Sequence, residues 1–554
     1  IPNSVTNIGE YAFYNCNGFT GELKIPNQIN TINESVFSNC FSFTKLTLHS
    51  KIKSINTKAF KGCYGFTEEL QLPSSLTYIG PYAFSGCKGF TGSLKIPENM
   101  KTIEPGVFSY CSGFTGSLTL SNILNISEYA FIGCSQMSGK LNLQNVNEIG
   151  QFAFSDCSEF QSLTLSNNLK AILSNTFAKC TKLVGTLTIP DSVQSIGESA
   201  FFMCKGFSGK LELPKNDKLI IEKLAFYGCD SFTGRLSLPE SIDTINDYSF
   251  YYCSKFDGEL KIPDSVRTIG NSAFSECSSL NGKLILPKNI TSIGEYAFSS
   301  CYKLQGSIII PESITKINRY TFNECYGFNG TLNLPSNIES IDECAFYECY
   351  RLNGELNIPN SVREIGMYSF YGCFGFTGQL KISNNTERIL EYAFFGCSKF
   401  CGNLTFSENI KKIYDYSFQG CSGFNGTLTI PSTTEIIGNY AFKGCTKFKG
   451  DLIIPESITD IGSGAFEECT GFDRDLSLPN SLININEHAF SGCTGFMCDL
   501  IIPDSVVYMG PYAFFKTGFG DHLTLSRKIV TIYEYTFSDC ANLKDKLQIP
   551  DSVT

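Results

Sequence analysis

The 554-residue sequence contains no tryptophan and only three histidines. His49, His488 and His522 are scattered, and no set of nucleophile, base and orienting group can be built around them. Asp and Glu are plentiful but spread at repeat spacing, which is typical of a solvated face. No Cys-x-x-Cys pair is present to indicate zinc. We therefore expect a protein that is not an enzyme and that has no cofactor and no metal site.

Clustered positive charge and long apolar runs are also missing. The formal net charge is -10, and no basic patch stands out, which argues against nucleic acid as a partner. No apolar run approaches the roughly 18 to 20 residues of a membrane helix, so we expect no transmembrane segment in this chain. The first residues already belong to a repeat, and no signal peptide is visible.

The dominant feature is an internal repeat of 23 to 25 residues, best seen in LKIPDSVRTIGNSAFSECSSLNG at 260–282. A Phe-x-x-Cys pair recurs 22 times at this period, and a further copy has Phe514 with Thr517 in place of the cysteine. A period in this range predicts a solenoid in which neighbouring repeats bury each other's apolar face. About eight apolar side chains per repeat cannot offset the ordering of 24 residues at about 1 to 2 kcal/mol each, so one repeat alone should be unfolded.

Each repeat predicts the same short elements in the same order. Leu-x-Ile-Pro indicates a short strand ended by proline, and a second extended piece ends in Ile. The Gly or Asn that follows, as at Gly150 or Asn246, tolerates positive φ and predicts a turn. Glu-Tyr-Ala-Phe-x-x-Cys predicts one helical or 3₁₀ turn, and Gly-Phe-Thr-Gly predicts the corner that leads to the next repeat.

The repeats run through the whole sequence. We therefore expect residues 1–554 to form a single continuous solenoid of about 23 units. The chain opens with Ile-Pro-Asn-Ser-Val-Thr and closes with Ile-Pro-Asp-Ser-Val-Thr, in the same phase of the unit. The sequence accordingly looks like an excerpt of a longer array whose capping repeats lie outside it.

Twenty-two of the 25 cysteines occupy one position of the repeat. Stacked repeats would place their sulfurs about 4.8 Å apart with parallel Cβ vectors, an arrangement poorly posed for a disulfide. We expect buried free thiols that act as small apolar residues, with a disulfide stack or a metal array as the alternative. Cys344, Cys401 and Cys498 share no position in the repeat and are expected to be unpaired surface thiols.

The unit IPxSVxxIGxYAFxxCxxF, as at 262–280, resembles the BspA-like or Treponema-type leucine-rich repeat over essentially the whole chain. The resemblance implies a right-handed leucine-rich-repeat solenoid, elongated and curved. It also implies a location at the cell surface or in secretion, and adhesion to extracellular-matrix proteins, host cells or other microbes. The 24-residue length departs from the shorter family repeat by an insertion around Thr-Gly.

One column of side chains is a candidate binding surface. Two residues before the repeat Phe, tyrosine occurs in 12 of 23 copies. The run is densest at Tyr296, Tyr320, Tyr368, Tyr392, Tyr416 and Tyr440, with Cys344 as its one interruption. Stacked tyrosines could shield the turn as a structural ladder, or they could form a binding face, since aromatic surfaces are enriched in recognition.

Three hypotheses on function remain open. The favoured one is a cell-surface adhesion module that binds protein or glycan ligands through many weak repeated contacts. The second is a structural spacer or surface coat whose repeats mainly self-associate, and the third is an intracellular scaffold, which free thiols would suit. If binding is localised, we expect it where the repeats deviate, as in the copy lengthened at Lys215–Lys218.

Overall fold

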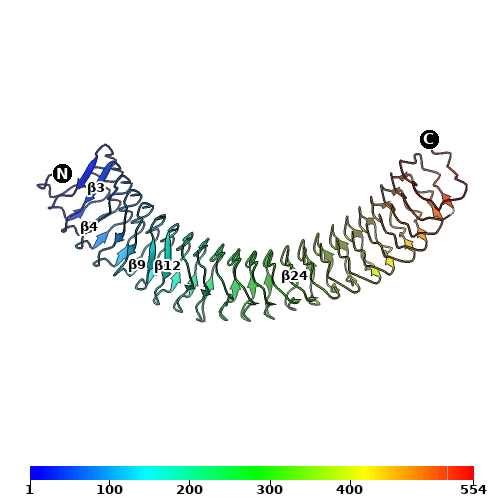
Figure 1. Cartoon of the computed structure of the whole chain (residues 1–554), viewed down its shortest axis with the longest axis horizontal. Helices are drawn as coiled ribbons and strands as arrows, with labels where there is room; N and C mark the ends of the chain where they lie inside the picture. Colours follow the sequence, from blue (N-terminus) through cyan, green and yellow to red (C-terminus); the bar gives the residue numbers. More distant parts are fainter. Residues whose placement is uncertain (521) are drawn as a thin grey trace. The chain divides into compact units, whose positions relative to one another are not determined.

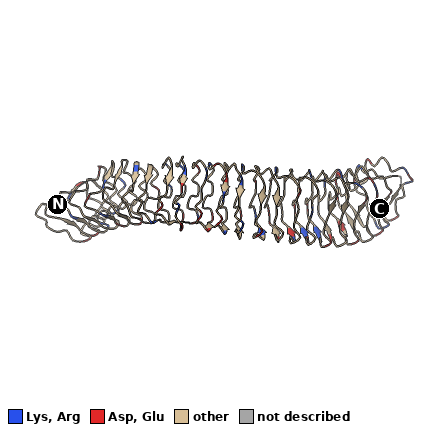
Figure 2. Ribbon diagram, turned by 90° about the horizontal axis from the view of Figure 1, so that it is seen from below, with Lys and Arg blue, Asp and Glu red and all other residues tan. Residues whose placement is uncertain are grey.

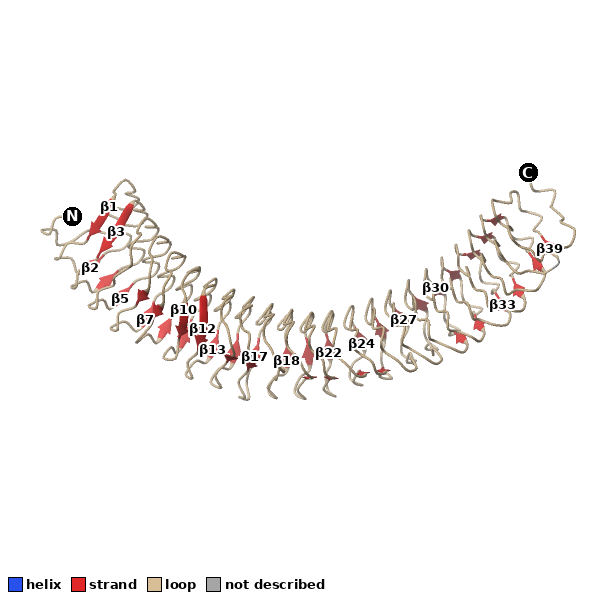
Figure 3. Ribbon diagram, viewed as in Figure 1, coloured by secondary structure: helices blue, strands red, loops and turns tan. Residues whose placement is uncertain are grey.

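The computed structural model describes residues 1–520 and 522–554 as coils that follow one another in sequence order (Figure 1). These residues form two compact units, Ile1–Leu280 and Asn281–Thr554. Each unit consists of short parallel strands joined by turns, and no helix occurs among the described residues (Figure 3). The predicted repeat solenoid of short parallel strands is therefore confirmed.

In the first unit, most coils contribute a first strand from Leu-x-Ile-Pro and a second strand that ends in Ile. The first strands are β1 (Gly21–Lys24), β3 (Phe43–Thr47), β6 (Leu94–Lys95), β8 (Leu118–Thr119), β10 (Gly139–Asn142), β12 (Phe160–Thr164), β14 (Leu187–Thr188), β16 (Leu211–Glu212) and β19 (Leu260–Lys261). The second strands are β2 (Thr31–Ile32), β4 (Ser54–Ile55), β5 (Tyr78–Ile79), β7 (Thr102–Ile103), β9 (Asn125–Ile126), β11 (Glu148–Ile149), β13 (Ala171–Ile172), β15 (Ser195–Ile196), β17 (Ile220–Ile221), β18 (Thr244–Ile245) and β20 (Thr268–Ile269).

The second unit repeats this plan. Its first strands are β21 (Leu284–Ile285), β23 (Ile308–Ile309), β25 (Leu332–Asn333), β29 (Leu404–Thr405), β31 (Leu428–Thr429), β33 (Leu452–Ile453), β35 (Leu476–Ser477), β37 (Leu500–Ile501) and β39 (Leu523–Thr524). Its second strands are β22 (Ser292–Ile293), β24 (Lys316–Ile317), β26 (Ser340–Ile341), β27 (Glu364–Ile365), β28 (Arg388–Ile389), β30 (Lys412–Ile413), β32 (Ile436–Ile437), β34 (Asp460–Ile461), β36 (Asn484–Ile485) and β38 (Tyr508–Met509).

The two kinds of strand pair to different extents. Nine second strands of the second unit, from β24 to β38, form one parallel sheet, in which Ile317 lies opposite Ile341 and Ile341 opposite Ile365. The first strands pair only two by two within each unit, as in β14 with β16 and β29 with β31. Equivalent residues therefore lie side by side in columns along each unit.

Columns of phenylalanine form the core of the coils. The repeat phenylalanines between Phe37 and Phe514 are buried and stack on one another, with Phe346, Phe370 and Phe394 at centroid spacings of 5.4 Å. A second column three residues after the cysteine stacks likewise, and Phe376 meets Phe370 edge to face at 6.2 Å. The apolar positions predicted from the repeat are thus the core, because each ring is covered by the rings of the neighbouring coils.

The segment Glu-Tyr-Ala-Phe-x-x-Cys forms successive β-turns and not the expected helical or 3₁₀ turn. In the coil of Tyr392, the N–H groups of Ala393, Phe395 and Cys397 donate to carbonyls three residues earlier. The alternate N–H groups, those of Tyr392, Phe394 and Gly396, donate to carbonyls of the next coil at 2.7 to 3.1 Å. Tyr392 and Gly396 have positive φ. A helix cannot form because half of its donors are directed to the neighbouring coil.

All 23 residues of the tyrosine column have positive φ, and so do all 23 residues directly before the repeat cysteine position. A backbone with positive φ is strained when the residue has a β-branched side chain. No Val, Ile or Thr occupies either column. The backbone conformation by itself therefore restricts which residue types can occupy the two columns.

The Gly or Asn after the second strand begins a turn, as predicted, since Ala153 donates its N–H to the carbonyl of Gly150 at 3.3 Å, but it does not adopt the positive φ that these residue types tolerate. Gly150 and Gly438 do not have positive φ. A Cβ at Gly150 would lie 2.2 Å from the N atom of Glu128 in the preceding coil, so glycine is needed there for close approach. Where Asn occupies the position, its amide bonds the neighbouring coil instead, as Asn246 Nδ2 does with the carbonyl of Ile221 at 2.7 Å.

All 25 cysteines are free thiols. Most repeat cysteines donate a hydrogen bond to the repeat Phe carbonyl of the preceding coil, as Cys349 does to Phe322 at 3.1 Å. The thiol is thus a donor as well as an apolar residue. Cys401 is exposed, as expected, but Cys344 is buried, because it lies within the tyrosine column and is covered by its neighbours.

These burials predict how the thiols react. In the native protein we expect a disulfide reagent such as DTNB to label Cys401 quickly, since it is the exposed thiol. The half-buried Cys16, Cys498 and Cys540 should react more slowly, and all 25 cysteines should react in 6 M guanidinium. Cys401→Ser should remove the fast phase, and fast labelling of many thiols in the native protein would contradict the burial.

The same burials predict a loss of stability at alkaline pH. Burial raises the pKa of Cys134, Cys277 and Cys349 to about 12, from an ordinary value of 9.0. The folded chain then holds protons that the unfolded chain releases from about pH 9 upward, so the free energy of unfolding falls as pH rises from 9 through 12. The urea midpoint should therefore decline above pH 9.

Two variants separate this effect from other alkaline effects. Cys349→Ala should reduce the pH dependence of the midpoint relative to its own value at pH 7.5, whereas Cys401→Ala should leave it unchanged. A midpoint that stays constant from pH 7.5 to 11 would show that the buried thiols do not control alkaline stability.

Candidate functional site: the aromatic ladders

The tyrosine column of the second unit is assembled as the sequence predicts. Stacked rings join Tyr296 to Tyr320 at 4.5 Å, Tyr368 to Tyr392 at 4.7 Å, Tyr392 to Tyr416 at 4.5 Å and Tyr416 to Tyr440 at 5.1 Å. Cys344 separates the first pair from the other four rings. All six predicted site residues thus lie in one column, as two stacks.

Stacking decides what this column can present to a ligand. The rings of Tyr368 and Tyr392 are tilted by only 9°, and those of Tyr392 and Tyr416 by 5°. Tyr296 is 38% exposed, and the other five tyrosines are half-buried. Inside each stack the ring faces are covered, so the column offers ring edges and hydroxyl groups.

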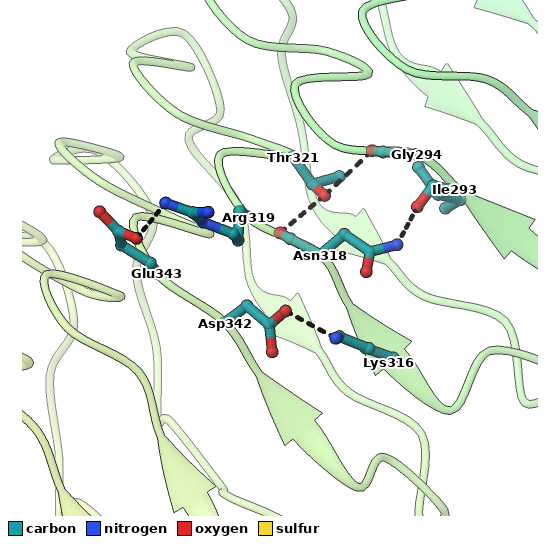
Figure 4. Close-up of polar contacts among 8 residues, drawn as sticks. All are labelled: Ile293, Gly294, Lys316, Asn318, Arg319, Thr321, Asp342 and Glu343. Carbon is teal, nitrogen blue, oxygen red and sulfur yellow. Dashed lines mark hydrogen bonds and ion pairs between the residues drawn. The ribbon is translucent and has the colours of Figure 1, made fainter.

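Cations of the chain itself lie over rings of this column. The Arg319 guanidinium pairs with Glu343 at 2.5 Å (Figure 4). It also lies 5.9 Å from the Tyr320 centroid, and Tyr320 donates its hydroxyl to the same carboxylate at 2.9 Å. Lys443 Nζ lies 5.4 Å from the Tyr440 centroid and pairs with Glu467 at 2.9 Å. The column therefore accommodates a cation beside a tyrosine and a glutamate.

Two further aromatic ladders flank the tyrosine column and were not identified from the sequence. One, directly after the repeat Phe, stacks Tyr347 on Tyr371 at 4.9 Å and Tyr371 on Phe395 at 4.7 Å. The other, directly after the repeat cysteine, stacks Tyr302, Tyr326 and Tyr350 at 5.3 and 5.1 Å. Reading these two positions of the repeat for aromatic runs would have revealed both ladders.

Burial and neighbouring carboxylates raise the pKa of tyrosines in the middle of these ladders. Burial, followed by the Glu324 and Glu348 carboxylates, raises the pKa of Tyr326. Burial and then Glu348 raise the pKa of Tyr347 to about 12. Burial, Cys344, Tyr371, Glu391 and Glu343 raise that of Tyr368. In this stretch the neighbouring charges act in one direction, because the nearby ionisable groups are acidic.

The second strands and the turns that follow hold the column in place. Asn318 donates its amide to the carbonyl of Ile293 at 2.6 Å (Figure 4). Thr321 donates its hydroxyl to the carbonyl of Asn318 at 2.9 Å. Lys316 on β24 pairs with Asp342 at 2.9 Å. These contacts position the turn that carries Arg319 and Tyr320.

The first unit offers a different surface feature, at its lengthened copy. A groove of about 1090 Å³ there is lined by residues including Thr188, Lys210, Glu212, Lys215 and Arg235. The inserted Asn216 bonds the carbonyls of Asp191 and Val193, and neither β14–β16 nor β15–β17 is paired with a strand of the following coil. This groove thus lies at a copy that deviates from the regular repeat.

The described residues contain no group of three or more His, Cys, Asp or Glu side chains that could hold a metal ion. His488 takes the place of a tyrosine and stacks on Tyr512 at 4.7 Å. Lys, Arg, Asp and Glu are scattered among the other residues within each unit (Figure 2). Across residues 1–520 and 522–554, the structure has no helix long and apolar enough to cross a membrane.

Comparison with known proteins identifies the repeat. Overlapping matches to the model of the BspA type leucine rich repeat region, itself six copies long, run from residue 1 to residue 554: 1–115, 91–208, 184–281, 208–329, 257–377, 329–449, 377–473 and 473–554. No curated protein sequence matches the chain.

Among solved structures, the chain is similar to a leucine-rich repeat protein from Bacteroides ovatus, with 20% identity, 90% of each chain covered and a TM-score of 0.30. It is also similar to a leucine rich cell surface protein from Faecalibacterium prausnitzii, with 23% identity, 68% of this chain and 87% of that chain covered, and a TM-score of 0.28. A leucine-rich repeat protein from T. pallidum is 24% identical over 32% of this chain and 72% of its own, with a TM-score of 0.23.

Asn318 provides a test of the turn framework. Asn318→Ala removes the amide donor and leaves the Ile293 carbonyl without it, which should cost about 1 to 3 kcal/mol of local stability. Hydrogen exchange of the amides in β22 and β24 should accelerate accordingly. Asn384→Ala, at an exposed position, serves as the control and should cost less than about 0.5 kcal/mol. Equal effects of the two substitutions would contradict the role given to Asn318.

Proposed function

We propose, from the premise that this chain belongs to the family of BspA-type leucine-rich repeat proteins, that it is a non-enzymatic binding module for protein ligands outside the cell. The observation that carries the proposal is the side-by-side placement of equivalent side chains on successive coils. A partner that engages one coil weakly can engage the next coil in the same way, so avidity along the array replaces a single strong contact.

The tyrosine column of the second unit is the proposed contact surface. Its stacked ring centroids recur at 4.5 to 5.1 Å, close to the spacing of adjacent strands. A ligand with acceptor groups at a similar spacing could bond several coils at once. Protein ligands suit this surface better than sugars, since sugars pack on open ring faces and the stacked faces are covered.

The free thiols are compatible with a location at the cell surface or in secretion. Most are buried, and burial raises their pKa, so little reactive thiolate is available to an oxidant. An oxidising environment would therefore leave most of the core unchanged.

That residues 1–554 form one continuous array stays a prediction of the repeat pattern.

A structural spacer or surface coat whose repeats self-associate is the second candidate. It is favoured by the half-buried state of Tyr320, Tyr368, Tyr392, Tyr416 and Tyr440, whose rings cover one another as a purely structural ladder would. Under this reading the purified protein should assemble as its concentration rises, and it should bind none of the ligands tested.

The deciding experiment is binding of the purified chain to immobilised extracellular-matrix proteins and to a glycan panel. A variant with Tyr296, Tyr320, Tyr368, Tyr392, Tyr416 and Tyr440 changed to Ser should bind at least tenfold more weakly, because the repeated contacts are removed. Surface plasmon resonance gives the affinities, and circular dichroism establishes that the variant is folded.

The matched control changes Tyr82, Tyr129 and Tyr248 of the first unit to Ser, in the same column and at the same backbone conformation. Its affinity should stay within threefold of the wild type. Equal losses in both variants would place the effect in folding and not at the proposed surface. Saturable binding that survives in the six-residue variant would move the contact away from the tyrosine column, and absence of all binding would favour the spacer.

A further inference from the structure

The second unit contains two places where a cation, a tyrosine and a glutamate meet, and the chain supplies the cation at both. At the first, Arg319 lies over Tyr320 and pairs with Glu343. At the second, Lys443 lies over Tyr440 and pairs with Glu467. Both arrangements place positive charge against an aromatic ring and a carboxylate, which stabilise it together.

A third place has the ring and carboxylate components but no cation of the chain. Glu324 and Glu348 occupy the position before the cysteine in adjacent coils, between the ladder of Tyr347 and the ladder of Tyr326 and Tyr350. In the part of the chain that the structure describes, neither carboxylate forms an ion pair. The exposed Arg351 next to Tyr350 pairs with neither of them.

Open aromatic surface lies beside these two carboxylates. Tyr350 is 41% exposed and ends its stack, since no described ring lies against its other face. Phe374 is 47% exposed, and its ring lies against Gly396, where a Cβ would come within 2.8 Å of it. At this end of the ladder, in contrast to its interior, ring faces are available to a ligand.

The electrostatic environment favours a cation at this place. The largest cause of the raised pKa of Tyr326 is burial, and the next causes are the carboxylates of Glu324 and Glu348. Burial and Glu348 raise the pKa of Tyr347 to about 12. No basic side chain is among the causes for either tyrosine, whereas Lys443 lowers the pKa of Tyr440. Tyr326 and Tyr347 are hydrogen-bonded to the Glu348 carboxylate, and no cation of the described residues forms an ion pair with it or with Glu324.

We propose that Glu324, Glu348, Tyr350 and Phe374 form a binding site for arginine side chains of a basic partner protein. The inference rests on the proposed function and names the chemistry of the partner. The two carboxylates pair with guanidinium groups, and the open rings of Tyr350 and Phe374 cover their planar faces. Arginine suits the site better than lysine because guanidinium is planar, pairs with carboxylates in a bidentate manner and stacks on rings.

The test measures binding of a fluorescein-labelled hexaarginine peptide to the full chain by anisotropy. Hexalysine and hexaglutamate peptides are measured beside it, at about 50 and 150 mM salt. We expect saturable binding of hexaarginine, at least threefold weaker binding of hexalysine, and none of hexaglutamate. The affinity should fall with salt because two charge pairs form.

Three double variants locate the contact. The variant Glu324→Gln/Glu348→Gln should bind hexaarginine at least tenfold more weakly. The control Glu408→Gln/Glu435→Gln removes the same charge from exposed positions of the same unit and should change the affinity less than twofold. The variant Tyr350→Ser/Phe374→Ser should weaken hexaarginine more than hexalysine, because only guanidinium stacks. Urea midpoints identify any variant that has lost its fold.

The outcomes are separable from those of the matrix and glycan experiment. Absence of hexaarginine binding, equal losses in the two glutamate variants, or equal affinity for hexalysine would overturn the arginine site. If the chain binds a matrix protein but not hexaarginine, the site fails while the binding function stands. If it binds hexaarginine at this site but nothing on the matrix and glycan panel, the site stands and the function as a matrix or glycan binder fails.

Discussion

Hydrogen bonds between successive coils are the interaction on which the rest of this structure depends. In each turn alternate N–H groups, such as those of Tyr392, Phe394 and Gly396, donate to the next coil, and the buried thiols donate to the preceding one. A single coil has too few apolar side chains to fold alone, so the contacts between coils stabilise the folded chain. Every side chain is consequently set beside its equivalent in the neighbouring coils.

This arrangement explains both the order and the limits of the surface columns. The turn needs positive φ two residues before the repeat Phe, so that column excludes β-branched residues, and a run of tyrosine satisfies the backbone while its rings cover one another. The same stacking removes ring faces from solvent. A regular stretch of the ladder can therefore contact a partner through edges and hydroxyls, and a ring face is open only where a stack ends, as at Tyr350.

Local differences in charge and exposure occur where the residue type in a column differs from that in the neighbouring coils. Cys344 divides the tyrosine column, and the position before the cysteine changes from Glu348 to Gly372 beside the end of the Tyr350 stack. In the first unit, a groove lies at the copy lengthened at Asn216. A uniform array supplies length and repeated weak contacts, and its irregular positions supply local charge and open surface. This combination suits a protein that binds extended partners better than one that transforms a small substrate.

The amino-acid sequence by itself determined the period, the short parallel strands, the phenylalanine and cysteine columns and the assembly of six tyrosines in one column. Nearly identical units can bury their apolar faces only by stacking in register, so those features follow from the repeat. The conformation of the turns could not be read this way. Phe-x-x-Cys spacing fits a helical turn, but the competing hydrogen bonds from Phe394 to the next coil exist only in the stack.

The tertiary structure alone decided several further points. It buried Cys344, assigned Gly150 to close packing instead of positive φ, and stacked Tyr347 and Tyr350 on the rings of neighbouring coils. Neighbours along the chain are given by the order of residues. Contacts between coils depend on the direction in which each side chain points. The conformation of the turns sets this direction, and the repeat pattern does not encode that conformation.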